Sequence, residues 1–368
     1  MTDRGYAAGE RLLQSGKPQR ALVAFLAAVK QSPDNPSVWL RVADAAFLSG
    51  NAARAARACA RAYALGGGED LLRRALQAWL LAGDEASARR ALAGRAGGEA
   101  EFWRAVLACR ASRWAEARRL FLSAAGADPA RLAQRAGLFA AWAGHRAASG
   151  KMTKSPRGIS IVGLGWKRPR QATVGALDAL AGCRTLVAVA NTLDDSTRDL
   201  LCLFRAPVSA VAFRGSEAEA ERAARRALAA ASAGPAGTVT RGNPLVYGRF
   251  AARLVALARA RGIACRVLPG VSSYEGLAAE DRPAPGTPLG LEVRGVHDTF
   301  SEGGRALVVF TPRARARGVL PQRPAVWLAS EGPDSAASAR LSPAAAAALL
   351  ARGGAGGILY YPPRRSSR

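Results

Sequence analysis

Three short loops in the second half of the chain combine residue types that bring a ligand close to the backbone. They read GLGWKRP from Gly163, RGNPLVYG from Arg241 and PGVSS from Pro269. Glycine lets a ligand approach because it has no Cβ, and proline fixes the φ angle of a loop. Each loop follows a short β-rich run, so each is expected at the end of a strand. The set of three indicates a binding site more specifically than any one loop alone.

The sequence offers little that would bind a metal or a nucleotide. Its histidines are His145 and His297, and its five cysteines are scattered, at positions 59, 109, 183, 202 and 265. A zinc site needs about four clustered ligands, so no metal is expected. The run from Gly163 lacks the third glycine of the dinucleotide fingerprint and the acidic residue about 20 positions later. No Gly-Lys-Ser/Thr triplet marks a phosphate loop, so nicotinamide and P-loop chemistry are not expected either.

Strands and helices are predicted to alternate from Gly158 onward. Runs such as ISIVGLG and TLVAVA are separated by helical patterns such as EAEAERAARRALAAASAG. This alternation is typical of an α/β fold with a parallel sheet. Ligands of such sheets bind at the carboxyl ends of the strands, where the three loops are expected.

The order of the three loops resembles the class III S-adenosylmethionine-dependent methyltransferases, which share the tetrapyrrole methylase fold. That family opens with Gly-x-Gly-Pro-Gly-Asp-Pro-x-x-Leu-Thr, and the matching positions here are Gly163, Gly165, Pro169 and Thr173. Its Gly-Asp-Pro-x-x-x-Gly-Arg loop matches Gly242, Asn243, Pro244, Gly248 and Arg249, and its Pro-Gly-x-Ser/Thr matches Pro269, Gly270 and Ser272. The resemblance covers residues 158–368 and implies two α/β lobes, about 158–240 and 241–368, with the cofactor folded between them.

The resemblance also implies roles for individual residues. The cofactor-lining positions are Arg241, Gly242, Asn243, Val246, Ser272, Ser273 and Thr311. The loop facing the methyl acceptor holds Gly163, Gly165, Trp166, Arg168 and Thr173. In this loop Trp166, Lys167 and Arg168 replace the family's Pro-Gly-Asp, which argues against a usual tetrapyrrole acceptor.

A second branch of the same fold, the borosin-type peptide N-methyltransferases, resembles this chain in other details. It shares the Gln-x-Thr at Gln171–Thr173 and a stretch close to RGIACRVLPGVSSYEGLAAEDRPAPG. Its catalytic tyrosines are missing from the matching segment, so that activity is not transferred whole, and the catalytic residues stay unassigned. The candidates are Arg214, Tyr247 and Tyr274. The short tail after GILYY holds no hydrophobic core peptide, so a peptide substrate is expected in trans.

The first half of the chain carries internal repeats. SGKPQRA begins at Ser15, and related strings follow at Ser49, Ala82 and Ala111. A period of about 34 residues is typical of two-helix repeat units. The pattern resembles tetratricopeptide repeats, which implies an all-α solenoid over residues 1–143 that docks a peptide or protein. A polar stretch, 144–157, is predicted to link it to the methylase-like domain at 158–368.

The charge is strongly basic, with 53 Lys and Arg against 27 Asp and Glu, a net +26. Only five of the basic residues are lysines, and the Arg, Ala and Gly excess is also what biased codon usage produces. Charge alone is therefore not taken as a sign of a nucleic-acid partner. No run approaches the ~20 apolar residues of a membrane span, and the N-terminus is not a secretion signal. A cytoplasmic homodimer is expected.

These observations predict a methyltransferase that uses S-adenosylmethionine, with a peptide or protein acceptor held by the repeats. A tetrapyrrole or another small-molecule acceptor is the alternative within the enzyme class. A non-catalytic adaptor that binds proteins through its repeats is the alternative outside it.

Overall fold

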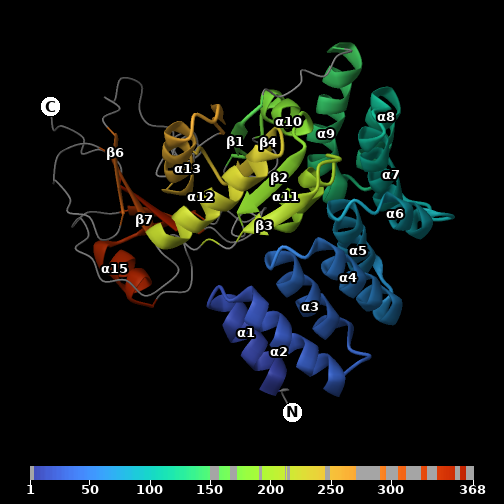
Figure 1. Ribbon diagram of the computed structural model, residues 1–368, viewed down its shortest axis with the longest axis horizontal. Helices are drawn as coiled ribbons and strands as arrows, with labels where there is room; N and C mark the ends of the chain where they lie inside the picture. Colours follow the sequence, from blue (N-terminus) through green and yellow to red (C-terminus); the bar gives the residue numbers. More distant parts are fainter. Residues whose placement is uncertain are drawn as a thin grey trace. The chain divides into compact units, whose positions relative to one another are not determined.

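The computed structural model describes residues 4–149, 157–165, 172–189, 193–211, 213, 216–244, 249–270, 291–295, 306–311, 325–329, 338–352 and 357–361. Its contacts divide the chain into two compact units, Met1–Gly270 and Val271–Arg368. The first unit holds the helical region and a parallel sheet (Figure 1).

Residues 4–149 are helical, and each helix packs against the next one along the chain. We call the odd-numbered helices first helices and the even-numbered ones second helices. The helices are α1 (Arg4–Gln14), α2 (Pro18–Gln31), α3 (Pro36–Leu48), α4 (Ala52–Gly66), α5 (Glu69–Leu81), α6 (Glu85–Leu92), α7 (Gly98–Arg110), α8 (Trp114–Ala127) and α9 (Pro129–Ser149). The predicted all-helical first half is confirmed.

The predicted repeat strings form the turns between first and second helices. Gly16, Gly50 and Gly83 follow α1, α3 and α5 with φ values of 69°, 82° and 84°. This left-handed conformation is easy for glycine and ends a helix. Ser112 occupies the same place after α7 with a φ of 60°, so the fourth turn is made without glycine.

The parallel sheet has the strand order β3-β2-β4-β1-β5. Its strands are β1 (Ile159–Gly163), β2 (Thr185–Val189), β3 (Val208–Val211), β4 (Ala236–Thr240) and β5 (Cys265–Leu268). Its helices are α10 (Val174–Ala181), α11 (Asp195–Leu201), α12 (Glu217–Ser232) and α13 (Arg249–Ala260). The predicted α/β alternation is confirmed.

The two faces of the sheet are covered by different helices. Ile161 of β1 packs in a cluster with α12 and α13, whereas its neighbour Val162 belongs to a cluster with α10 and α11. Successive side chains of a strand point to opposite faces. The helices that follow β1 and β4 therefore lie on opposite sides of the sheet.

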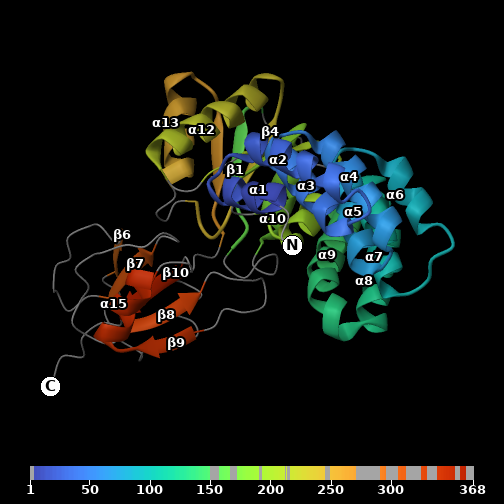
Figure 2. The same cartoon turned by 90° about the horizontal axis from the view of Figure 1, so that it is seen from below.

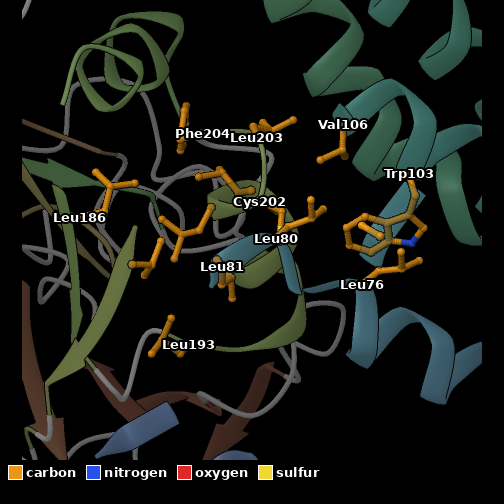
Figure 3. Packing of buried hydrophobic residues seen from close by; sticks show 14 of the residues in the cluster. Leu76, Leu80, Leu81, Trp103, Val106, Leu186, Leu193, Cys202, Leu203 and Phe204 are labelled. Carbon is orange, nitrogen blue, oxygen red and sulfur yellow. The ribbon is translucent and has the colours of Figure 1, made fainter. Parts of the chain in front are cut away.

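The cluster on the α10 and α11 side is shared with the helical region. Figure 3 shows Leu80 of α5 and Trp103 of α7 in the same packing group as Leu203 and Phe204, which follow α11. Trp103 and Leu80 are at most 1% exposed. One continuous apolar core therefore joins the helices to the sheet.

The last helix of the region, α9, continues through Ser149 and so occupies the start of the predicted linker, 144–157. Contacts with the sheet domain explain the extra length. Trp142 donates a hydrogen bond from Nε1 to Asp178 of α10 at 2.9 Å, and His145 lies 3.3 Å from the same carboxylate. Arg146 covers the ring of Trp114.

The second unit contains a five-stranded sheet with the order β6-β7-β10-β8-β9, visible in Figure 2. Its elements are β6 (Leu291–Gly295), β7 (Ala306–Thr311), β8 (Ala325–Ala329), β9 (Ser338–Leu341), α15 (Pro343–Arg352) and β10 (Gly357–Tyr361). β6 and β7 are parallel, and the other pairs are antiparallel. β7 covers the run ALVVFT, and β10 covers the run GILYY.

No helix among the described residues is long and apolar enough to cross a bilayer.

Candidate functional site

The candidate site lies at the carboxyl ends of β1, β4 and β5, which are adjacent in the sheet. The loop after β1 leads to α10 on one face, and the loop after β4 leads to α13 on the other. This reversal is a topological switch point, the place where open α/β sheets bind ligands. All three glycine loops of the sequence converge there.

The convergence depends on glycines that meet backbone to backbone. A Cβ built on Gly163 would lie 2.6 Å from the nitrogen of Gly270 and 2.7 Å from Cδ of Pro244, and it would also overlap the carbonyl oxygen of Gly242. A Cβ on Gly270 would lie 2.6 Å from the carbonyl oxygen of Gly163 and from the nitrogen of Gly165. Real Cβ atoms do not approach other atoms so closely. Gly163 and Gly270 are thus required for the three loops to touch.

The loops after β1 and β4 are also joined by hydrogen bonds. Leu164 donates its backbone N–H to the carbonyl of Thr240, and Gly242 donates to Gly165, both at 3.0 Å. Gly165 and Gly242 form an isolated antiparallel bridge beyond the parallel strands. The bridge holds the two loop backbones side by side at the switch point.

Gly242 differs from the two packed glycines. Its φ is +66°, and no described atom lies within 4 Å of a Cβ built there. A side chain built on Gly242 would therefore project into open space, although the positive φ of this residue still favours glycine. Gly242 and Pro244 are buried, and Arg241 and Asn243 beside them are half-buried. Gly242 therefore leaves space beside its backbone, next to the half-buried polar residues Arg241 and Asn243.

The structure brings together some of the predicted site residues. Gly163, Gly165, Arg241, Gly242 and Asn243 lie at the switch point. Thr173, predicted to face the acceptor, is the N-cap of α10, and its Oγ1 accepts a hydrogen bond from the N–H of Ala176 at 3.1 Å. This hydrogen bond caps the first turn of α10, so the Thr173 hydroxyl has a structural role.

Other predicted residues lie outside the described residues. They are Trp166, Arg168, Arg214, Val246, Tyr247, Ser272, Ser273 and Tyr274. Thr311 ends β7 in the second unit, where it pairs with Gly357 of β10. Its predicted role as a cofactor contact stays a prediction.

Sequence reasoning missed a set of charged residues where the first helices meet α11. Asp199 of α11 is fully buried, and its Oδ2 lies 2.7 Å from Arg73 of α5 and 2.7 Å from Arg135 of α9. Gln77 donates to its other oxygen at 2.8 Å. No local signal in the sequence marks Asp199, because its partners are 64 to 126 residues away.

Two more first helices contact the same region. Asp44 of α3 pairs with Arg198 of α11 at 3.4 Å. Arg110 of α7 is 3% exposed and donates to the carbonyl of Cys202 at 3.2 Å and to that of Phe204. Four first helices in succession, α3, α5, α7 and α9, therefore place polar side chains on the sheet domain. We call this surface of the helical region its lobe-facing side.

Among the described residues, no group of three or more His, Cys, Asp or Glu side chains is arranged to hold a metal ion.

Two family models match the chain. Residues 158–285 match the Tetrapyrrole (Corrin/Porphyrin) Methylases, and residues 6–70 match a tetratricopeptide repeat. The chain therefore carries a tetrapyrrole methylase domain behind tetratricopeptide repeats. The predictions of an enzyme, a methyltransferase, and of S-adenosylmethionine as its cofactor are confirmed by this match.

The solved structures that match this chain include the following three. Uroporphyrin-III C-methyl transferase from Thermus thermophilus, complexed with S-adenyl homocysteine, is 21% identical over 55% of this chain and 96% of its own, with a TM-score of 0.41. A putative cobalamin synthesis related protein from Corynebacterium diphtheriae is 18% identical over 56% and 98%, with a TM-score of 0.44. Precorrin-6Y methylase from Archaeoglobus fulgidus is 17% identical over 57% and 100%, with a TM-score of 0.41. A comparison with curated proteins finds no match.

Proposed function

We propose that the loops after β1, β4 and β5 bind S-adenosylmethionine and that the protein transfers its methyl group to an acceptor bearing carboxylates. The observation that carries the proposal is the close approach of Gly163 to both Gly242 and Gly270 at the switch point. When bound, S-adenosylmethionine supplies a sulfonium methyl group that a nucleophile displaces in line. Such a reaction asks the protein mainly to position two reactants and to exclude water.

The residues present fit this cofactor. The open side of Gly242 leaves room for a bent ligand against the backbone. Asn243 offers a neutral amide that donates and accepts hydrogen bonds, which suits a ribose or an amino-acid group. The packed pair Gly163 and Gly270 holds the loops rigid, so their N–H and C=O groups are positioned before the ligand arrives.

The acceptor is inferred from charge and from the family match. In the sequence, Trp166, Lys167 and Arg168 follow Gly165 directly, at the start of the loop expected to face the acceptor. Cationic side chains recognise carboxylates, and tetrapyrroles, the substrates that give the matched family its name, carry several. Although Trp166, Lys167 and Arg168 depart from the family's Pro-Gly-Asp, their charge suits a polycarboxylate and the family match outweighs the departure, so we place a tetrapyrrole polycarboxylate first.

A peptide or protein acceptor held by the repeats is the second candidate, and the tetratricopeptide match favours it. The lobe-facing side of α3, α5, α7 and α9 is already in contact with the chain's own sheet domain. A peptide held by the repeats would therefore have to use another surface. This consideration lowers the peptide acceptor to second place.

The first experiment is calorimetric titration with S-adenosylhomocysteine, comparing the natural protein with Gly242→Trp. The indole would fill the open side of Gly242, so binding should be lost, while Gly137→Trp on the exposed surface of α9 should bind normally. Absence of binding by the natural protein would leave the adaptor hypothesis as the better one.

The second experiment identifies the acceptor. Labelled S-adenosylmethionine is incubated with the protein and either a uroporphyrin-type macrocycle in its reduced form or a pool of peptides. Label in the macrocycle supports the first candidate, and label in a peptide supports the second.

We also propose a cytoplasmic homodimer. The five cysteines are free thiols, and four of them are buried, which suits a reducing compartment. Sedimentation equilibrium would test the dimer.

A further inference from the structure

We propose that the second helices of the repeat region form a docking surface for an acidic polypeptide segment of a partner protein. This proposal does not depend on the methyl-transfer reaction. The sheet domain covers the lobe-facing side of the helical region. The second helices therefore provide the broad exposed surface of the region. None of α2, α4, α6 and α8 has substantial contact with the sheet domain.

Charge is distributed unequally between the two sets of helices. The first helices, α9 included, carry ten basic and six acidic residues. The second helices carry nine basic and two acidic residues. The acids are Glu85 and Glu116. The two sets carry similar numbers of basic residues, so what distinguishes the second helices is their scarcity of acidic residues.

Most of these cations have no acidic partner within the described part of the chain. Arg61 pairs with Asp34 and Arg89 with Glu85, both at 3.5 Å. Six exposed basic side chains form neither an ion pair nor a side-chain hydrogen bond there, and we call them the outer cations. They are Arg20, Lys30, Arg54, Arg57, Arg118 and Arg119. Their charge is available to an external anion.

The spacing of the outer cations places them in rows. Arg20 and Lys30 share one face of α2 with Val23, and Arg54 and Arg57 lie one turn apart on α4. The Arg61–Asp34 pair joins the exposed side of α4 to the turn after α2. Carboxylates at helical or extended spacing on a partner would meet several guanidinium groups at once, and such charge-assisted bonds are the stronger kind.

Two exposed apolar side chains distinguish a polypeptide from other polyanions. Val23 is 68% exposed and Leu122 is 51% exposed, and they are the large hydrophobic residues most exposed in the described part of the chain. Both lie on second helices, beside Arg20 and Arg119 respectively. Phosphate backbones offer nothing apolar to them, and single-stranded nucleic acid would need exposed aromatic platforms. A membrane surface would need a wider apolar face than one valine per helix.

The test measures binding of a fluorescent peptide rich in Glu and Leu to the full-length protein by anisotropy. The double variant Arg54→Glu/Arg57→Glu should weaken binding about tenfold or more, a loss of about 1.4 kcal/mol. The matched control is Arg222→Glu/Arg259→Glu, which changes the net charge equally at exposed sites on α12 and α13. The control should retain affinity within about twofold.

A second comparison tests the chemistry of the partner. Val23→Ser should weaken the Glu/Leu peptide about threefold and leave a pure poly-glutamate probe unchanged. Equal loss in the two charge variants would show that net charge alone attracts the peptide and would overturn the proposal. Tighter binding of duplex DNA or phosphatidylserine vesicles, lost in the Arg54/Arg57 variant, would also overturn it in favour of a different polyanion.

Discussion

Asp199 on α11 lies 2.7 Å from Arg73 on α5, and neither oxygen of its carboxylate reaches solvent. The two residues are 126 positions apart, in the helical region and in the sheet domain. Arg135 of α9 meets the same oxygen. The buried charge of Asp199 is therefore compensated only when both the helical region and the sheet domain are in place.

Asp199→Ala should destabilise the first unit by about 3 kcal/mol, because it leaves Arg73 without its paired carboxylate and Arg135 with Glu99 alone. Urea unfolding followed by circular dichroism measures the loss. Asp34→Ala removes an exposed partner of Arg61 and should leave the midpoint nearly unchanged. A similar midpoint for both variants would show that the buried contact contributes little.

Gly163→Ala should cost about 1–3 kcal/mol of stability through overlap with the loops after β4 and β5. It should also weaken the binding of S-adenosylhomocysteine at least about tenfold, since the three loops must move apart to make room for the alanine side chain. Gly137→Ala is the control, because the new Cβ meets nothing and the residue lies within an exposed turn of α9. That variant should gain up to about 1 kcal/mol. Unchanged ligand affinity in Gly163→Ala would argue against a site at the switch point.

Acid should destabilise the contact around α11. Burial favours the neutral form of Asp195, but Arg74, Arg73 and Arg198 outweigh it and hold the pKa of this carboxyl below its usual value. A carboxyl with a depressed pKa in the folded state binds more protons when unfolded, so its stabilisation is present above about pH 4 and is lost as pH falls through the folded-state pKa.

Asp195→Asn should therefore flatten the fall in unfolding free energy below about pH 5. Urea titrations at a series of pH values measure the slope. Asp34→Asn, which removes the same charge from an exposed turn, should leave the slope close to that of the natural protein. If the unfolding free energy falls with the same slope in all three proteins, Asp195 does not contribute to the acid sensitivity.

Removing residues 1–149 should prevent the methylase domain from folding in soluble form. The truncation would uncover Phe204, which is 3% exposed in the complete chain and packs against the ring of Trp142. Expression of residues 157–368, followed by titration with S-adenosylhomocysteine, tests this. A soluble fragment that binds with unchanged affinity would show that the repeats are a separable arm.

Much of the backbone could be predicted from local patterns. Gly16, Gly50 and Gly83 recur at a fixed period because each turn needs a left-handed residue, so the repeats were visible in the sequence. The three strand-end loops were visible because close approach demands glycine and proline. Both signals are local, and local sequence records them directly.

The contact between repeats and sheet could not be predicted in the same way. Asp199 and Arg73 look like ordinary charged residues of amphipathic helices, whose outward side would be expected to meet water. Periodicity tells which residues share a face and not what covers that face. The capping role of Thr173 is a local one that a threonine before a helix commonly takes, and its acceptor-facing role stays a prediction.

The shared core of the repeats and the sheet has a consequence for synthesis. A ribosome releases the N-terminal region first, so α3, α5 and α7 emerge before α11 has been translated. During that interval Leu80 and the cation Arg110 face water, because residues 202–204, which lie against them in the finished protein (Figure 3), have not yet been made. The nascent repeats would therefore expose an apolar, positively charged surface that favours aggregation. A chaperone that binds this surface until residue 204 has been synthesised would raise the yield of folded protein.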